Sequence, residues 1–164
     1  MSKEHSIGTG ELKGIFRKPK IAEAEKIQAL INYHAKKDEM LPRALNDIYE
    51  GIRDFWVYVE NGEIIGCAAL HVDWVDLAEI RSLAVAEEYK GRGIGKRLVR
   101  CCLEEAKDLN ISKVFALTYK PGFFKKLGFH DISKEQLPRK IWSDCVKCPK
   151  FPNCDEHAVM IELA

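Results

Sequence analysis

The chain has 164 residues with 26 basic and 25 acidic side chains, so its formal net charge is only +1. This balance argues against a nucleic-acid partner, and a hydrophobic content of 46% argues against a disordered chain. No apolar run reaches the roughly 18 residues that a membrane helix needs, so we expect a soluble, cytoplasmic protein without a membrane partner. The length suits one domain over residues 1–164, with residues 1–10 as a flexible leader.

Apolar periodicity and turn residues predict the elements in chain order. We expect a short strand over 14–19, a helix over 21–37 and a second helix over 44–52. The clearest hairpin joins FWVYVE to EIIGCAALHV through Asn61-Gly62, because Asn-Gly suits the two positive-φ positions of a type I′ turn. The remaining elements are a strand over 77–85, a helix over 93–109, a strand over 114–118, a short helix over 123–128 and strands over 129–132 and 157–163. This order predicts an α+β (mixed α/β) fold, in which helices flank a mixed sheet that begins as an antiparallel meander.

A glycine-rich stretch, EYKGRGIGKRLV, precedes the predicted helix over 93–109. Its alternate glycines let the backbone adopt positive φ and approach a ligand closely, and the first N–H groups of the helix have no partner within the helix. The stretch also carries four basic residues, Lys90, Arg92, Lys96 and Arg97. Together these features predict an anion site for a phosphate, with a flexible helix entry as the alternative. The pattern is neither a P-loop nor a G-x-G-x-x-G fingerprint.

In its wider context, SLAVAEEYKGRGIGKRLV resembles the core motif of the GCN5-related N-acetyltransferase (GNAT) superfamily, which binds acetyl-coenzyme A (acetyl-CoA). Lys90, Gly93 and Gly95 stand where that family has Q/R-x-x-G-x-G/A, and FFKKLGF resembles its second landmark. The resemblance implies that two parallel strands, LAEIRSLAV and VFALT, splay apart to admit acetyl-CoA between them. It also implies a set of acetyl-CoA-binding residues, namely Leu83, Ala84, Val85, Lys90, Gly91, Arg92, Gly93, Ile94, Gly95, Lys96, Phe123, Phe124 and Lys126.

Five separated motifs, MLPRAL, AEIRSLAV, FALT, ELPRKIW and DCVKCPKFPNCDE, together resemble the short bacterial N-acetylglutamate synthases of arginine biosynthesis. This narrower resemblance implies an enzyme that acetylates the α-amino group of L-glutamate. The alternatives are another amino acid such as glutamine, a protein N-terminus, or a domain that binds acyl-CoA and regulates a partner without turnover. The oligomeric state stays open, and a homodimer is compatible with the sequence.

The resemblance makes Glu79 the general base, because an α-ammonium group must lose a proton before it attacks the thioester. Strand alternation places its side chain on the same face as Arg81 and Leu83, and an ion pair with Arg81 is the alternative role. Substrate carboxylates need cations, for which the substrate-binding candidates are Arg43, Arg81, Arg139 and Lys140.

Many acetyltransferases have a tyrosine where this chain has Phe124, so the usual acid for the leaving thiolate is absent. Thr118 and Tyr119, at the end of the strand over 114–118, are the catalytic candidates that could supply a hydroxyl instead.

Six cysteines in such a chain suggest reduced thiols or metal ligands more than disulfides. Cys145, Cys148 and Cys154 have the spacing C-x2-C-x5-C, and with His157 they could complete a structural zinc site. Free thiols and a labile disulfide are the alternatives. We expect Cys67, and at least one of the helical pair Cys101 and Cys102, in the core.

Overall fold

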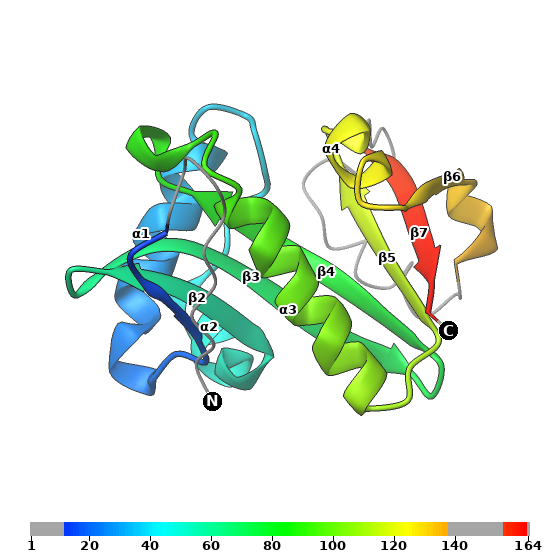
Figure 1. Cartoon of the computed structure of the whole chain (residues 1–164), viewed down its shortest axis with the longest axis horizontal. Coiled ribbons are helices and arrows are strands. Elements are labelled where there is room, and N and C mark those ends of the chain that lie inside the picture. Colours follow the sequence, from blue (N-terminus) through cyan, green and yellow to red (C-terminus); the bar gives the residue numbers. More distant parts are fainter. Residues whose placement is uncertain (1–11, 138–155, 164) are drawn as a thin grey trace.

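The computed structural model describes residues 12–137 and 156–163. Over these residues the chain forms a seven-stranded sheet in the order β1-β2-β3-β4-β5-β7-β6 (Figure 1). Every neighbouring pair is antiparallel except β4 and β5, which are parallel. The strands are β1 (Ile15–Arg17), β2 (Phe55–Glu60), β3 (Glu63–Trp74), β4 (Leu77–Val85), β5 (Lys113–Thr118), β6 (His130–Ile132) and β7 (His157–Glu162). This mixed, mostly antiparallel sheet confirms the predicted α+β class.

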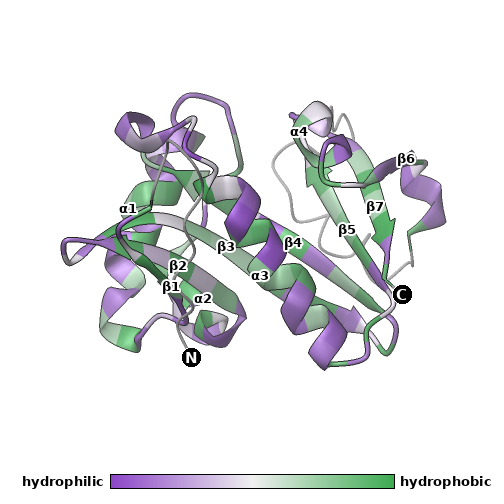
Figure 2. Cartoon of the chain, in the orientation of Figure 1, coloured by the Kyte–Doolittle hydropathy of each residue, from purple (hydrophilic) through white to green (hydrophobic). Residues whose placement is uncertain are grey.

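Helices cover both faces of the sheet, with α3 across one face and α1 and α2 on the other (Figure 1). In Figure 2, α3 carries hydrophilic residues on its outer side, whereas β5 and β7 are mainly hydrophobic. None of the helices within the described residues combines the length and apolar character that a membrane crossing requires. The helices and 3₁₀ turns are η2 (Ile21–Glu23), α1 (Ala24–Ala35), α2 (Leu45–Glu50), η3 (Ile52–Asp54), η4 (Glu87–Tyr89), α3 (Ile94–Asp108), α4 (Pro121–Lys125) and η5 (Lys134–Gln136).

The described residues form three apolar clusters, two of which lie beneath the helices on the two faces while the third gathers Leu77, Phe115 and Leu137. The cluster beneath α3 includes Leu98 and Cys102, and the cluster beneath α1 and α2 includes Ile31, Ile48 and Cys67. The burial of both cysteines confirms that they behave as small hydrophobic residues. Element boundaries differ from the predicted ones by a few residues: the predicted helix over 21–37 divides into η2 and α1, and β3 continues to Trp74.

The parallel strands β4 and β5 separate after a short contact. They pair only at Leu77–Lys113, Ala78–Val114 and Glu79–Phe115. Beyond this point β5 continues along β7 as far as Thr118, so it leaves β4 and follows its other neighbour. The divergence is visible in Figure 1 and confirms the splay that the family resemblance implied.

A β-bulge interrupts β4 where it passes the splay. Cys67 of β3 pairs with Ala84 of β4, and the next pair is Ala69 with Arg81. Between these pairs β3 advances two residues and β4 advances three, so β4 has one extra residue. Ser82, within the bulge, has a φ of 55°. An extra residue reverses the alternation of side chains along a strand.

The bulge corrects one prediction about the faces of β4. Leu83 and Val85 pack on the α3 side, together with Ala78 and Ile80. Glu79 lies between Ala78 and Ile80 in the strand, so its side chain faces the opposite side of the sheet. The expectation that Leu83 shares a face with Glu79 is wrong, because simple alternation does not hold across Ser82.

Candidate active site

A cleft of about 1380 Å³ opens between the splayed strands and extends from the loop before α3 to α2 and η3. Most of the predicted acetyl-CoA-binding residues line it, and only Arg92 and Lys126 of that set do not. The Arg92 guanidinium instead stacks on the ring of Tyr89, with its Cζ 4.9 Å from the ring centroid. The lining members are Leu83, Ala84, Val85, Lys90, Gly91, Gly93, Ile94, Gly95, Lys96, Phe123 and Phe124.

The loop end of the cleft is built from backbone. Gly91 and Gly93 have φ angles of 84° and 82°, which strongly favour glycine. Gly93 is the N-cap of α3, and its carbonyl accepts the first bond of the helix, from the N–H of Arg97 at 3.1 Å. The N–H groups of the first helical turn therefore point toward the cleft end without intrahelical partners. With the helix dipole and the nearby Lys90 and Lys96, this cradle suits a phosphate.

Glu79 lies at the apex of the splay, as the last residue of β4 that pairs with β5. It is only 8% exposed, and Arg81 Nε donates a hydrogen bond of 2.7 Å to its Oε1. Burial raises the pKa of the Glu79 carboxyl, the Arg81 charge opposes this rise, and the charge of Asp73 adds to it. A carboxylate with a raised pKa binds a proton more readily, so Glu79 has the chemistry of a proton acceptor.

Arg43 approaches the same end of the cleft from the loop between α1 and α2. Its backbone is held by side chains of α1, since its carbonyl accepts from Gln28 Nε2 at 3.2 Å and its N–H donates to Asn32 Oδ1 at 3.4 Å. Its guanidinium donates to Ser82 Oγ at 3.0 Å and so contacts the bulge.

Electrostatics at this end favour an anion. Burial lowers the pKa of the Arg43 guanidinium, and repulsion from the charge of Arg81 lowers it further. A carboxylate near both arginines would relieve that repulsion and could accept planar, charge-assisted hydrogen bonds.

The opposite wall carries the two hydroxyl candidates. Thr118 and Tyr119 both line the cleft at the end of β5. Thr118 Oγ1 accepts a hydrogen bond of 2.9 Å from the N–H of Lys120. Phe124 is 4% exposed and packs edge to face with Phe123 and Phe129, so it combines a core position with a place in the cleft lining.

Part of the predicted site lies outside the described residues. Arg139 and Lys140 belong to this part, as do three members of the predicted zinc set, Cys145, Cys148 and Cys154. The fourth member, His157, begins β7 opposite Thr118 and is exposed. The zinc site therefore stays a prediction.

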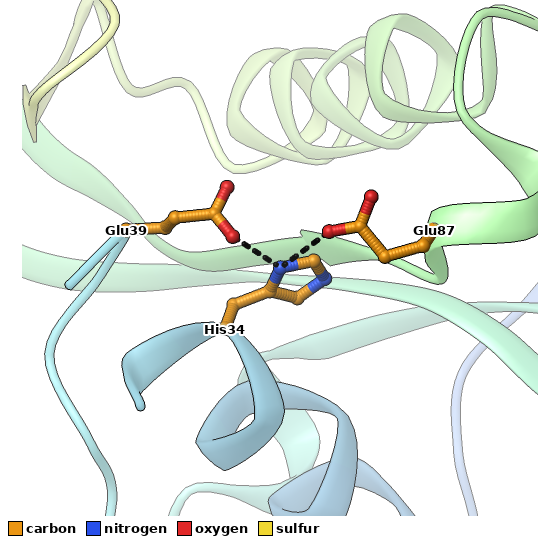
Figure 3. A group of neighbouring side chains, drawn as sticks. All are labelled: His34, Glu39 and Glu87. Carbon is orange, nitrogen blue, oxygen red and sulfur yellow. Dashed lines mark hydrogen bonds and ion pairs between the residues drawn. The ribbon is translucent and has the colours of Figure 1, made fainter. Parts of the chain in front are cut away.

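Sequence reasoning missed a cluster of ionisable side chains beside the cleft, formed by His34, Glu39 and Glu87 (Figure 3). His34 of α1 is buried, with Nε2 2.8 Å from the carbonyl oxygen of Val85. Its Nδ1 lies 3.3 Å from Glu39 Oε1 and 3.9 Å from Glu87 Oε1. In the sequence His34 continues the apolar helical stripe of Ile27 and Ile31. A histidine in such a stripe was the one sequence signal of a buried polar group.

Lysines balance the two carboxylates of this group. Lys90 lies within 3.6 Å of both, and Lys37 lies 3.2 Å from Glu87. Lys120, from the opposite wall, reaches Glu39 at 3.6 Å. The two carboxylates and the imidazole are close enough together to hold a cation. Lysine ammonium groups, however, already contact both carboxylates. We therefore interpret the group as an ion-pair link between the chain that follows α1, through Glu39, and the chain that follows β5, through Lys120.

The splayed strands, the glycine cradle and the buried carboxylate at their apex define an N-acetyltransferase of the GNAT type. Residues 21–129 match the acetyltransferase (GNAT) family, and the chain belongs to that family. It is an acetyl-CoA-dependent N-acetyltransferase, and the cleft has the cradle that its co-substrate needs.

Two curated relatives have similar length. An uncharacterized N-acetyltransferase of Chlorobaculum tepidum is 43% identical over 147 residues, covering 90% of this chain and 95% of that protein. An amino-acid acetyltransferase of Mycobacterium tuberculosis is 33% identical, covering 82% of this chain and 78% of that protein.

Solved structures agree with this relationship. Rv2747 from Mycobacterium tuberculosis, in complex with CoA and NLQ, has a TM-score of 0.80 at 29% identity, covering 91% of this chain and 99% of its own. N-acetylglutamate synthase from Neisseria gonorrhoeae, complexed with coenzyme A and N-acetyl-glutamate, has a TM-score of 0.85 at 26% identity. It covers 94% of this chain, which corresponds to 36% of that longer protein.

Proposed function

We propose that this enzyme transfers the acetyl group of acetyl-CoA to the α-amino group of L-glutamate, the first step of arginine biosynthesis, with Glu79 as general base. One observation carries the proposal: a buried carboxylate, Glu79, lies beside the guanidiniums of Arg43 and Arg81 in the cleft that the glycine cradle also lines. A phosphate-bearing thioester and an amino acid could then approach each other from opposite ends.

The amine end supplies the groups that an amino acid requires. The carboxylates of glutamate would bind Arg43 and Arg81, with Arg139 and Lys140 as further cations of the proposed substrate site. Glu79 would take a proton from the α-ammonium, directly or through one water. The neutral nitrogen then attacks the thioester carbonyl carbon, and the carbon–sulfur bond breaks.

The leaving sulfur needs a proton, and the amine nitrogen must lose its second one. Thr118 and Tyr119 are the proposed donors, because both residues carry a hydroxyl and line the cleft at the end of β5. A thiol has a reference pKa of about 8.5, so the demand on any acid is modest near neutral pH.

The relatives support an amino-acid substrate, although the side chain of that substrate is a proposal. An amino-acid acetyltransferase is among the curated relatives, and one similar structure is complexed with N-acetyl-glutamate. Glutamine and a protein N-terminus remain the alternative acceptors. A regulatory domain without turnover is disfavoured by the buried carboxylate beside the arginines, a combination that coenzyme binding alone does not need.

Thiol release from acetyl-CoA tests the proposal directly. We expect release with L-glutamate to exceed release with glutamine, aspartate, other free amino acids and short peptides, and mass spectrometry to identify N-acetylglutamate. D-glutamate is the matched control, because it carries the same charges in the wrong configuration. Preferred turnover of a peptide, or tight acetyl-CoA binding with no release on any amine, would overturn the proposal.

A further inference from the structure

A histidine lies directly opposite the proposed base. His71 of β3 is the cross-strand partner of Glu79 on β4. Residues that face each other in an antiparallel pair have Cβ atoms about 4.5–5.5 Å apart, within reach of long side chains. His71 and Glu79 both line the cleft, and so does Asp54 at the end of η3.

The contacts of His71 define its tautomer. Its Nδ1 lies 2.9 Å from Asp54 Oδ2, and an ionised carboxylate can only accept, so Nδ1 carries a proton. Nε2 is then the nitrogen that can take up a second proton. It lies 3.8 Å from Oδ1 of the buried Asp73, whose charge would stabilise the resulting imidazolium.

Exposure rises sharply from Glu79 to its two neighbours. The side chain of Glu79 is 10% exposed, whereas those of His71 and Asp54 are 39% and 34% exposed. A proton on Glu79 is therefore shielded from water, while a proton on His71 has access to it. The three side chains lead from the apex of the cleft to the surface.

The reaction needs such an exit. The substrate enters as an ammonium and leaves as a neutral amide, so its nitrogen loses two protons in each turnover. One of them ends on the thiol of coenzyme A, and the other must reach the solvent. Glu79 cannot accept a proton from the next substrate until it has released the last one.

We infer that His71 relays the proton from Glu79 to solvent and that Asp54 is the positioning residue that holds its imidazole. This inference rests on the proposed function, with Glu79 as base. The Glu79 carboxyl O–H gives its proton to Nε2 of neutral His71, directly or through one water, which regenerates the carboxylate. The imidazolium, between Asp54 and Asp73, then releases the Nε2 proton to water.

The charged groups around the imidazole favour this role. Asp54 faces it from η3, Asp73 from its own strand, and Glu79 with its partner Arg81 from β4. Within the described part of the cleft, α2 contributes two more carboxylates and the preceding loop one guanidinium, from Asp47, Glu50 and Arg43. Carboxylates outnumber cations, so an imidazolium is stabilised during the transfer.

Chemical rescue distinguishes a relay from a structural histidine. We expect His71→Ala to lower kcat by about a hundredfold, the low end of the range for a group that moves a proton, with an unchanged KM for acetyl-CoA. Added imidazole should restore kcat in proportion to its neutral form, because it replaces the missing proton carrier. The matched control is His130→Ala, an exposed histidine of β6 outside the cleft, which should keep full activity and show no response.

A second variant keeps the inference testable if His71→Ala does not fold. Asp54→Asn preserves size but removes the charged acceptor that holds Nδ1 of His71, so kcat should fall and added imidazole should restore part of it. The relay is disproved if folded His71→Ala keeps the wild-type kcat or ignores imidazole, or if Asp54→Asn keeps the wild-type kcat. These failures differ from failure of the proposed function, because they are measured with whichever amine supports thiol release.

Discussion

The two proposed binding regions of the cleft are built in different ways. At the glycine-loop end, backbone N–H groups and the helix terminus form the site, and they come from one contiguous stretch of chain. At the amine end, side chains from the α1–α2 loop, η3, β3 and β4 meet at the apex of the splay. The first kind of site depends on backbone conformation, and the second depends on the tertiary structure that brings separate segments together.

The largest effect expected at the amine end comes from Glu79→Gln. A positioned general base contributes about 10²–10⁴-fold, so kcat should fall by that order while the KM for acetyl-CoA is unchanged. The residual rate should rise with pH, because more of the free amine is already neutral. Steady-state thiol release over a range of pH measures both effects.

Stability provides the control for this variant. Burial raises the pKa of Glu79 above its ordinary value of 4.5, so its contribution to stability is present below that pH and is lost as the pH rises through the folded-state pKa. At a pH above the folded-state pKa the wild-type enzyme has lost this contribution, so thermal unfolding there should show Glu79→Gln to be at least as stable. Wild-type turnover in the variant would mean that the ion pair with Arg81 is the whole role of Glu79.

Arg43→Ala should separate amine recognition from the rest of the cleft. Losing a charge-assisted bond to a carboxylate costs about 1.5–3 kcal/mol, which is roughly tenfold or more in affinity. The KM for glutamate should therefore rise by about that factor, with little change in the KM for acetyl-CoA. Arg53→Ala, in the exposed part of η3, is the matched loss of charge outside the cleft. Equal rises for both substrates would instead assign Arg43 a structural role at the Ser82 bulge.

The smallest of the three effects is expected at the backbone end, from Gly93→Val. A β-branched residue at a φ of 82° is strained by about 1–3 kcal/mol, so the loop should shift and acetyl-CoA affinity should fall by roughly 5- to 100-fold. Calorimetry on the folded variant measures the affinity. Gly62→Val, at a φ of 74° in the β2–β3 turn, introduces similar strain away from the cleft. If the folded Gly93→Val variant binds acetyl-CoA with unchanged affinity, the glycine loop is not the phosphate-binding part of the site.

Much of the site was predictable from local patterns, and the exceptions have a common cause. The glycine loop, the order of elements and the position of Glu79 in a strand all follow from short stretches of sequence. His34 and His71 were missed because each is informative only through its partners, Val85 for one and Asp54 and Glu79 for the other. Those partners come from other elements, and a single sequence does not specify their distances.

By itself, the sequence determined the class of fold and predicted the anion cradle. Periodicity and glycine conformation act within a few residues, and they predict the same structure whatever the rest of the chain does. Only the tertiary structure decided which side chains share the apex of the cleft. The bulge at Ser82 sets Leu83 and Glu79 on opposite faces, and the register of β3 against β4 sets His71 opposite Glu79. Both depend on how strands pair across the sheet, which is a property of the folded chain and not of any one segment.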